Sequence, residues 1–379
     1  MSTESTTASR IGSLDQFRGY TVLGMFFVNF VGSFAAIPAI FKHLNTYCSY
    51  ADTIMPHFFF AVGFAYRMTL LRRLEKDGAW SAYSKFVRRC LGLILIGAVI
   101  YHLDGATKTW ADLQTLGVWG FLKQAFQRNF FQTLVHIGVT SLWVMPVMAR
   151  RPVVLAAFAL GSAALHVALS HWFYYDFAMK RPVIDGGPLG FLTWTLPLIA
   201  GALAYDCISA VGTTRSVSRL LGWGCVLMLA GYALACLNRV TPPAELTIGP
   251  QTDDASAWTG NFLVQPPFVP PSHRVNIWTM SQRAGSVSYL TFGAGLSLAV
   301  FALFVWACDL RSFRLGIFAT LGSNALAGYI IHDLVAEAIK PFAPKDSPLW
   351  FALAAFGVFL GITYIFVRYL ERNRIFLRL

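Results

Sequence analysis

The chain has 379 residues, of which 56% are hydrophobic and only 13% are charged, and its mean hydropathy is +0.56. A soluble protein of this length carries about twice that charged fraction, so the composition excludes an ordinary soluble globular protein. The net charge of +12 does not indicate a nucleic-acid partner. The basic residues flank apolar runs instead of alternating with stacking aromatic residues, which is typical of topology determinants in a membrane protein.

Apolar runs of about 18 residues or more recur along the whole sequence. This pattern predicts an all-α integral membrane protein, a polytopic bundle of about ten transmembrane helices. A membrane β-barrel is excluded because its strands alternate apolar and polar residues, and these runs do not alternate. The predicted spans are residues 20–41, 53–71, 86–103, 130–149, 153–171, 189–207, 220–237, 285–308, 316–338 and 349–368.

The segments between the spans predict one transmembrane domain over residues 1–379. Residues 1–19 are polar and contain no apolar core of a signal peptide, so we expect a cytoplasmic N-terminal segment and a retained first span. Residues 104–129 contain TWADLQTLGVWGFLKQAF, which predicts an interfacial amphipathic helix. Residues 238–284 are rich in proline and predict a long extracytoplasmic loop, of the kind that serves as a lid or a binding loop.

The orientation follows from Lys and Arg, which concentrate in the segments that are inside when the N-terminus is cytoplasmic. This distribution predicts that both termini are cytoplasmic. The expected location is a multi-pass protein of a bacterial inner membrane.

Several polar side chains interrupt the apolar spans, where they are costly. Taken one at a time, each has a structural interpretation. Asn29 in FFVNFVG provides an interhelical hydrogen bond at mid-membrane, His43 is an interfacial residue, and Asp52 caps the second span. In span 316–338, Asn324 and His332 are packed polar residues.

Taken together, the polar groups around the first span indicate a reaction. Asp15 and Arg18 lie at its cytoplasmic approach, Asn29 lies in its middle, and His43 and Asp52 lie beyond its outer end. This arrangement suits an anionic cytoplasmic donor that delivers a chemical group across the bilayer. A histidine can act as base or nucleophile at neutral pH, and a nearby carboxylate can orient it.

Metal chemistry is not indicated by the sequence. His166 and His171 are five residues apart, which is not the spacing of a helical ligand pair, and no HExxH motif occurs. The six cysteines form no CxxC pair and read as small apolar residues.

Three stretches near the N-terminus carry a resemblance to a known family. They are LDQFRGYTVLGMFFVNFVG at 14–32, FKH at 41–43 and ADTIMPHFFFAVGFA at 51–65. Later stretches agree in order: NIWTMS at 276–281, LGSNALAGYIIHDLV at 321–335 and RNRIFLRL at 372–379. Together they resemble the catalytic domain of heparan-α-glucosaminide N-acetyltransferase and its bacterial relatives.

The resemblance implies a transmembrane acetyltransferase that moves the acetyl group of cytoplasmic acetyl-CoA to a sugar amine at the opposite face. In this family pattern His43 matches the catalytic histidine, Asn29 matches an asparagine that helps to hold the acetyl carbonyl, and Asp52 matches the aspartate of the second block. Asn324 and His332 match the polar positions of a late helix.

The donor side of the site follows from charge as well as from the resemblance. We expect Arg18 and its basic neighbours to meet the CoA phosphates, since Arg matches phosphate in fork geometry. The expected acetyl-CoA group is Arg18, Asp15, Asn324 and His332, and the expected catalytic group is His43, Asn29 and Asp52. The chain departs from the family at LNTYCSY, between His43 and Asp52, where the family has a Trp and a Gly and one more residue.

Two other classes of function stay open from the sequence. A secondary transporter would carry paired broken helices around a solute site, and the sequence shows no matched pair of interrupted spans. A structural subunit would not need the mid-membrane asparagine and the histidines. The expected partners are the lipid bilayer, acetyl-CoA and an amino-sugar or glycan acceptor. The choice between amine and hydroxyl, between direct transfer and an acetyl-histidine, and between monomer and homodimer stays open.

Overall fold

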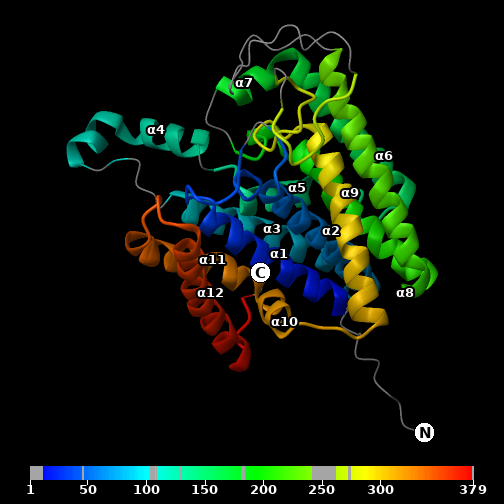
Figure 1. Ribbon diagram of the computed structural model, residues 1–379. Helices are drawn as coiled ribbons and strands as arrows, with labels where there is room; N and C mark the ends of the chain where they lie inside the picture. The colour runs from blue at the N-terminus through cyan, green and yellow to red at the C-terminus, as the bar shows by residue number, and fades with distance from the viewer. Residues whose placement is uncertain are drawn as a thin grey trace.

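A computed structural model describes residues 12–44, 47–102, 107, 109–128, 130–180, 184–240, 262–271 and 275–377. Every regular element in these ranges is helical (Figure 1), so the all-α membrane fold class predicted from the sequence is confirmed. In this part of the chain, five helical segments are long and apolar enough to cross a membrane. The number of about ten spans stays a prediction.

Twelve α-helices make up this part of the chain, with short 3₁₀ and π turns between them. They are α1 Gly12–Val31, α2 Tyr50–Asp77, α3 Ala79–His102, α4 Trp110–Arg128, α5 Thr133–Val144, α6 Pro152–Leu169, α7 Tyr175–Lys180, α8 Phe191–Cys236, α9 Val287–Phe304, α10 Gly316–Ser323, α11 Ala325–Ile339 and α12 Leu349–Arg372. The long helix α8 is interrupted at Gly212, whose φ of 77° and ψ of 165° are not helical. It therefore covers both predicted spans 189–207 and 220–237.

Helix α2 is the centre of the bundle, because it contributes buried side chains to all three large apolar clusters. The backbones of α2 and α8 are in direct contact where the two helices cross. A Cβ on Gly63 would lie 1.7 Å from the Leu198 carbonyl oxygen, and a Cβ on Gly201 would lie 2.0 Å from that of Phe60. Only glycine fits at these two points, which is the small-residue packing that membrane helices use when no hydrophobic effect drives them together.

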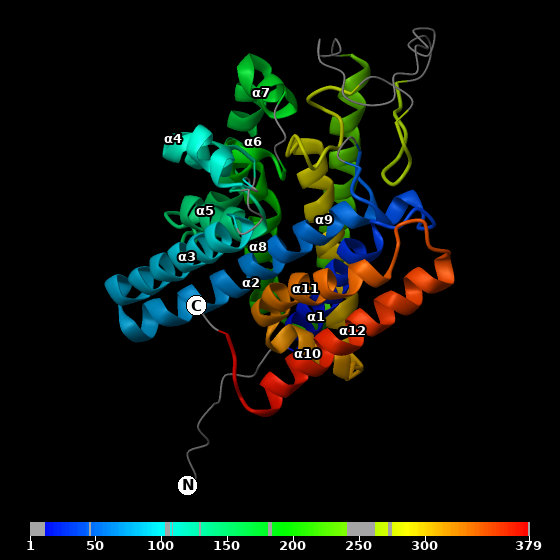
Figure 2. The ribbon, with the colours of Figure 1, turned by 90° about the vertical axis from the view of Figure 1, so that its left-hand side faces the viewer.

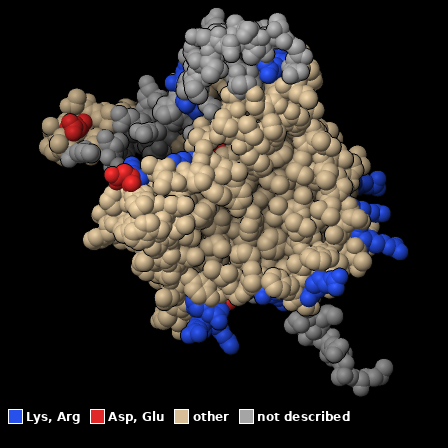
Figure 3. Space-filling view, viewed as in Figure 1, with Lys and Arg blue, Asp and Glu red and all other residues tan. Residues whose placement is uncertain are grey.

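The outer helices have the character of a lipid-facing layer. Only 22% of the most apolar window of α12 is buried, against 67% for α2. Large exposed side chains such as Ile365 and Leu229 would be unfavourable in water but are suited to hydrocarbon. The space-filling view shows a broad middle band without basic side chains, with Lys and Arg around the lower and right-hand rims (Figure 3).

The first helix differs from the predicted span 20–41. It begins at Gly12 and ends at Val31, and residues 32–44 and 47–49 form turns and extended backbone, with one 3₁₀ turn at Ala39–Phe41. Gly32 and Pro38 lie within this apolar run and do not favour a continuing helix. As a result, Asn29 lies in the last turn of α1 and is exposed, so the prediction that it lies near the middle of the first helix was wrong.

The predicted span 316–338 is also not one helix. It is divided at Asn324, whose φ of −134° and ψ of 45° separate α10 from α11. The side chain of Asn324 explains the break, because it binds the C-terminal tail on both of its polar atoms. Its Nδ2 donates to the Ile375 carbonyl at 2.9 Å, and its Oδ1 accepts from the Leu377 amide at 3.1 Å.

Helix α4 lies in the segment for which an interfacial helix was predicted. Figures 1 and 2 show it projecting from the body of the bundle, beside the end where α7 lies. It bends at Gly117, which has a φ of 64°. The described parts of the long segment 238–284 pack on the same end of the molecule as α7 (Figure 1).

Candidate active site

The start of α2 is fixed by a reciprocal cap between Ser49 and Asp52. The Ser49 hydroxyl accepts from the Asp52 amide at 3.3 Å, and Asp52 Oδ2 accepts from the Ser49 amide at 2.9 Å and its hydroxyl at 3.0 Å. The Tyr289 hydroxyl of α9 donates to the Asp52 carbonyl oxygen at 2.5 Å. Asp52 therefore caps the helix, as its structural interpretation predicted, and its carboxylate is held rigidly.

The other carboxylate oxygen of Asp52 binds His43. Asp52 Oδ1 lies 2.8 Å from His43 Nδ1. The aspartate is fully buried, whereas the His43 side chain keeps 39% of its surface exposed. With Nδ1–H donated to the carboxylate, Nε2 carries the free lone pair, which is the tautomer that a base or nucleophile needs.

His43 lies outside the helices, and its charge state depends on the groups around its ring. Crowding by protein lowers the pKa of the imidazole, but the Asp52 hydrogen bond, the negative charges of Asp52 and Asp185 and the nearby Gln282 amide outweigh this effect. The net result is a pKa above the usual histidine value. His43 is therefore a stronger base than an isolated histidine, and it is charged over a wider range of pH.

Asp185 and Gln282 are parts of this site that the sequence did not reveal. Asp185 is 3% exposed, and its Oδ1 accepts from Gln282 Nε2 at 2.7 Å. Burial, opposed by the Gln282 hydrogen bond and by His43, raises the Asp185 pKa to about 7. Asp185 stands before two glycines, a turn signal, and nothing in that pattern indicates a partner in a distant loop.

The last turn of α1 lies level with the start of α2. Gly24 of α1 lies against Ile54 of α2, because a Cβ on Gly24 would be 2.7 Å from Ile54 Cδ1. Further along the two helices, the ring centroids of Phe17 and Phe60 are 5.6 Å apart. This antiparallel register brings Asn29 to the height of the Ser49 cap. Among the described residues no hydrogen bond to the Asn29 side chain is formed, so its amide is available to a ligand.

Three of the four predicted acetyl-CoA residues lie at the end of α1 away from His43. Asp15 and Arg18 face each other at 4.0 Å in the first turns of this helix. Asn324 is near them, because a Cβ on Gly322 would lie 2.0 Å from the Asp15 carbonyl oxygen. The structure thus brings Asp15, Arg18 and Asn324 to one end of α1.

His332 occupies an intermediate position. Its buried ring stacks on Phe26 with the centroids 5.4 Å apart, one turn before Asn29. Its Nδ1 lies 2.5 Å from the Tyr329 carbonyl oxygen, and its Nε2 is 3.2 Å from Asp333 Oδ1. His332 is therefore packed against the middle of α1, between the Arg18 end and the His43 end.

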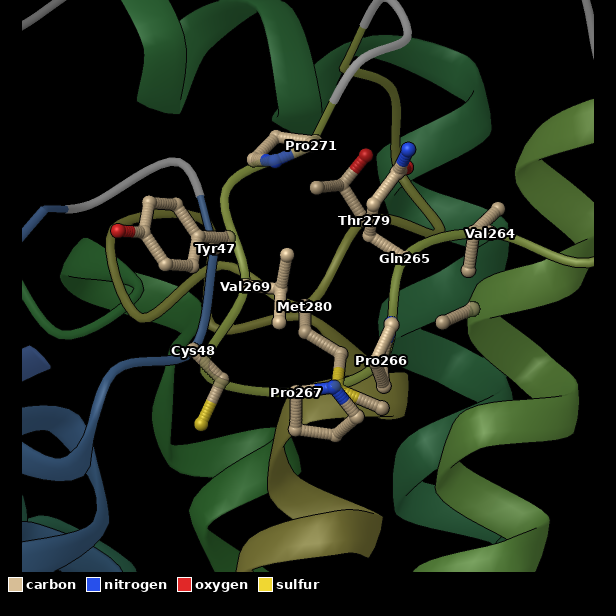
Figure 4. Close-up of a pocket in the computed structure, with 11 residues that line it drawn as sticks. Tyr47, Cys48, Val264, Gln265, Pro266, Pro267, Val269, Pro271, Thr279 and Met280 are labelled. Atoms are coloured by element: carbon tan, nitrogen blue, oxygen red, sulfur yellow. The ribbon is translucent and has the colours of Figure 1, made fainter.

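A small pocket adjoins the cap of α2 on the side of the long segment (Figure 4). Tyr47 and Cys48 form one wall, and the segment 264–271 with its prolines forms another. This segment is tied down because the Phe268 amide donates to the Cys48 carbonyl oxygen at 2.9 Å and Tyr232 donates to the Val264 carbonyl oxygen at 2.6 Å. The loop predicted at 238–284 thus reaches the chain next to the His43–Asp52 pair.

These observations define an all-helical membrane protein with a histidine–carboxylate pair at one end of its first helix. Residues 10–184 match the family model described as heparan-alpha-glucosaminide N-acetyltransferase, catalytic. The resemblance predicted from the sequence is therefore confirmed over just under half of the chain, and the match supports a membrane acetyltransferase. A search of curated proteins finds no match.

Proposed function

We propose that the protein transfers the acetyl group of cytoplasmic acetyl-CoA to an amine of a sugar acceptor at the extracytoplasmic face. The observation that carries the proposal is the His43–Asp52 pair, with its 2.8 Å contact, inside a region that matches an acetyltransferase family. Both termini are then cytoplasmic, in agreement with the Lys and Arg distribution. The His43 end of α1 faces the acceptor, and the Arg18 end faces the donor.

The donor interacts with α1 along its length in this account. The Arg18 guanidinium binds a CoA phosphate near the cytoplasmic end. The acyl end reaches the last turn of the helix, where the Asn29 amide donates a hydrogen bond to the thioester carbonyl oxygen and stabilises the negative charge that develops there. The donor site is completed by Asp15 of α1 and by Asn324 and His332, which lie beside this helix.

His43 then performs the proton transfer. The acceptor nitrogen attacks the acetyl carbon, and His43 Nε2 takes a proton from that nitrogen while Asp52 stabilises the imidazolium. The C–S bond breaks, its electron pair goes to sulfur, and the imidazolium protonates the thiolate of CoA. The same Nε2 would carry the acetyl group if transfer goes through an acetyl-histidine, so both routes use one geometry.

Binding of free CoA tests the donor site without any need to know the acceptor. CoA at about millimolar concentration should raise the thermal unfolding temperature of the purified protein by a few degrees, because a ligand that binds only the folded state stabilises it. Arg18→Ala should reduce that shift. Lys76→Ala, which removes an exposed charge at the end of α2, should leave it unchanged.

A missing shift in monodisperse wild-type protein would contradict the acetyl-CoA site. A transporter of an unrelated solute would behave in that way. An equal loss in the Arg18 and Lys76 variants would show that CoA responds to overall charge and not to a site on α1.

A further inference from the structure

The pocket beside the α2 cap, shown in Figure 4, plays no part in the transfer mechanism. Its wall is nevertheless joined to the catalytic pair by a chain of contacts. Cys48 in this wall is bonded to Ser49, whose hydroxyl donates to Asp52 Oδ2 at 3.0 Å. Asp52 in turn binds His43 Nδ1 at 2.8 Å. The pocket therefore adjoins the place where the acceptor amine reacts in the proposed function.

The wall formed by residues 264–271 is held in one shape. The Phe268 amide donates to the Cys48 carbonyl oxygen at 2.9 Å, and the Val269 amide donates to the Pro266 carbonyl oxygen at 3.2 Å. Phe268 has φ = 73°, a left-handed conformation that is rare for a bulky residue and persists only where the surroundings hold it. Four prolines restrict the same segment further. A pocket that is already formed binds a ligand without the cost of ordering a loop.

The described residues that line the pocket are uncharged, and most of them are apolar. Cys48 and Met280 are 1% and 6% exposed, and with Pro267 they form an apolar part of the lining. This part suits a methyl group. A carboxylate or sulfate would lose its water here without gaining an opposite charge. Tyr47 and Cys48 belong to LNTYCSY, the stretch in which this chain departs from the family pattern, so this wall is particular to the chain.

Thr279 adds one polar contact to this apolar lining. Its side chain lies beside Gln265 (Figure 4), and the residue is 5% exposed. Its hydroxyl oxygen accepts hydrogen bonds from Asn238 Nδ2 at 2.9 Å and from the Asn276 amide at 3.0 Å. A hydroxyl has two lone pairs and one proton, so both lone pairs are in use and the proton is left to donate. No described residue accepts this proton, so the pocket presents one buried donor that a ligand can satisfy.

An acetamido group matches both features, because it ends in a methyl group and carries a carbonyl oxygen that accepts a hydrogen bond. A sugar hydroxyl would leave the apolar part of the pocket unfilled. On the basis of the proposed function, we propose that the pocket binds an acetamido group on the sugar next to the one whose amine reacts. The methyl group packs against Met280 and Cys48, and the carbonyl oxygen accepts from Thr279 Oγ1. The acceptor is accordingly an oligosaccharide that already contains an N-acetylated sugar.

Transfer to two disaccharides measures the contribution of the pocket. One is glucosamine linked to N-acetylglucosamine, and the other is glucosamine linked to glucose, which has a hydroxyl in place of the acetamido group. The wild type should have a kcat/KM about tenfold higher for the N-acetylated disaccharide, the effect of one neutral hydrogen bond and one buried methyl group. Val269→Trp, at a lining position that is 44% exposed, should fill the pocket and abolish this preference. Leu263→Trp is the matched control, because it is 62% exposed in the same segment and outside the pocket lining, and it should keep the preference.

A pair of Thr279 variants tests the hydrogen bond itself. Thr279→Val removes the donor with little change of shape and should reduce the preference by about threefold to tenfold. Thr279→Ser keeps the hydroxyl and should keep the preference. An equal preference in the valine and serine variants would exclude Thr279 as the donor to the acetamido group. Because Thr279→Val also removes the acceptor for Asn238 and Asn276, Val269→Trp decides the role of the pocket if the valine variant does not fold.

Binding without transfer separates the pocket from the reaction. The disaccharide of two N-acetylglucosamine units has no free amine, so it is a ligand and not an acceptor for N-acetylation. At millimolar concentration it should raise the thermal unfolding temperature of the wild type and of Leu263→Trp, because a ligand that binds only the folded state stabilises it. The disaccharide of two glucose units should give no such shift, and Val269→Trp should lose it.

The outcomes distinguish the pocket from the proposed function. Equal shifts with the two disaccharides, or a shift that Val269→Trp keeps, would overturn the assignment of the pocket. A selective shift without transfer from acetyl-CoA to either glucosamine disaccharide would overturn the proposed function and leave the pocket as an acetamido site. Transfer to both disaccharides at equal rates, without a selective shift, would overturn the assignment of the pocket and leave the proposed function intact.

Discussion

Replacing His43 by alanine should abolish almost all acetyl transfer while the protein still folds. The loss should be about 10²–10⁴-fold for a general base and larger for a covalent nucleophile. Folding should be little affected, because the side chain is 39% exposed and its carboxylate partner keeps the Ser49 hydrogen bonds. The measurement is single-turnover transfer from labelled acetyl-CoA, together with the CoA-induced thermal shift, which should persist.

A matched control is available in His171, an exposed histidine that follows α6. His171→Ala should keep wild-type transfer. If His43→Ala also keeps it, then His43 is only an interfacial residue and the proposed mechanism is wrong. The next histidines to test would be His57, whose ring centroid lies 5.5 Å from that of Phe17 in α1, and His332, whose ring stacks on Phe26.

Replacing Asp52 by asparagine should reduce transfer and also move its pH dependence. The asparagine amide cannot accept from His43 Nδ1 in the same way unless it turns its oxygen to the ring, so the productive tautomer is no longer fixed; a loss of about 10²-fold or more is expected. Transfer requires neutral imidazole, so the wild-type rate falls as the pH drops through the raised His43 pKa. Without the Asp52 charge the His43 pKa falls, so the fall of the transfer rate at acidic pH (the acidic limb of the pH profile) should move to lower pH.

The profile is best measured with a neutral aminooxy acceptor, since a basic amine would add its own protonation limb. Asp176→Asn serves as the charge-matched control and should keep the wild-type limb. A limb that stays at the wild-type pH in Asp52→Asn would contradict the assignment of this titration to His43.

Part of the site could be predicted from the sequence because its members lie close together in the chain. His43 and Asp52 are nine residues apart, and the Ser49–Asp52 spacing is that of a helix cap. Arg18 and Asp15 lie one helical turn apart on α1, so their shared position was also predictable. In each of these cases local spacing decides the geometry.

The rest depended on contacts that hydropathy does not encode. The apolar run after Val31 is typical of a membrane span, yet the helix ends at Val31, before Gly32 and Pro38. Asn29 therefore lies in its last turn and not near its middle. Asp185 and Gln282 meet across a large distance in sequence, through a turn that only the folded backbone defines. The division at Asn324 likewise follows from its contact with the C-terminal tail.

Transfer across a sealed membrane tests the central claim most directly. Purified protein is reconstituted into sealed vesicles with a basic amino sugar trapped inside, and labelled acetyl-CoA is added outside. The account predicts labelled N-acetyl product inside the vesicles for the molecules whose Arg18 end faces outward, and none with His43→Ala. Label that forms only when donor and acceptor share one side of the membrane, or that forms equally with His43→Ala, would contradict it.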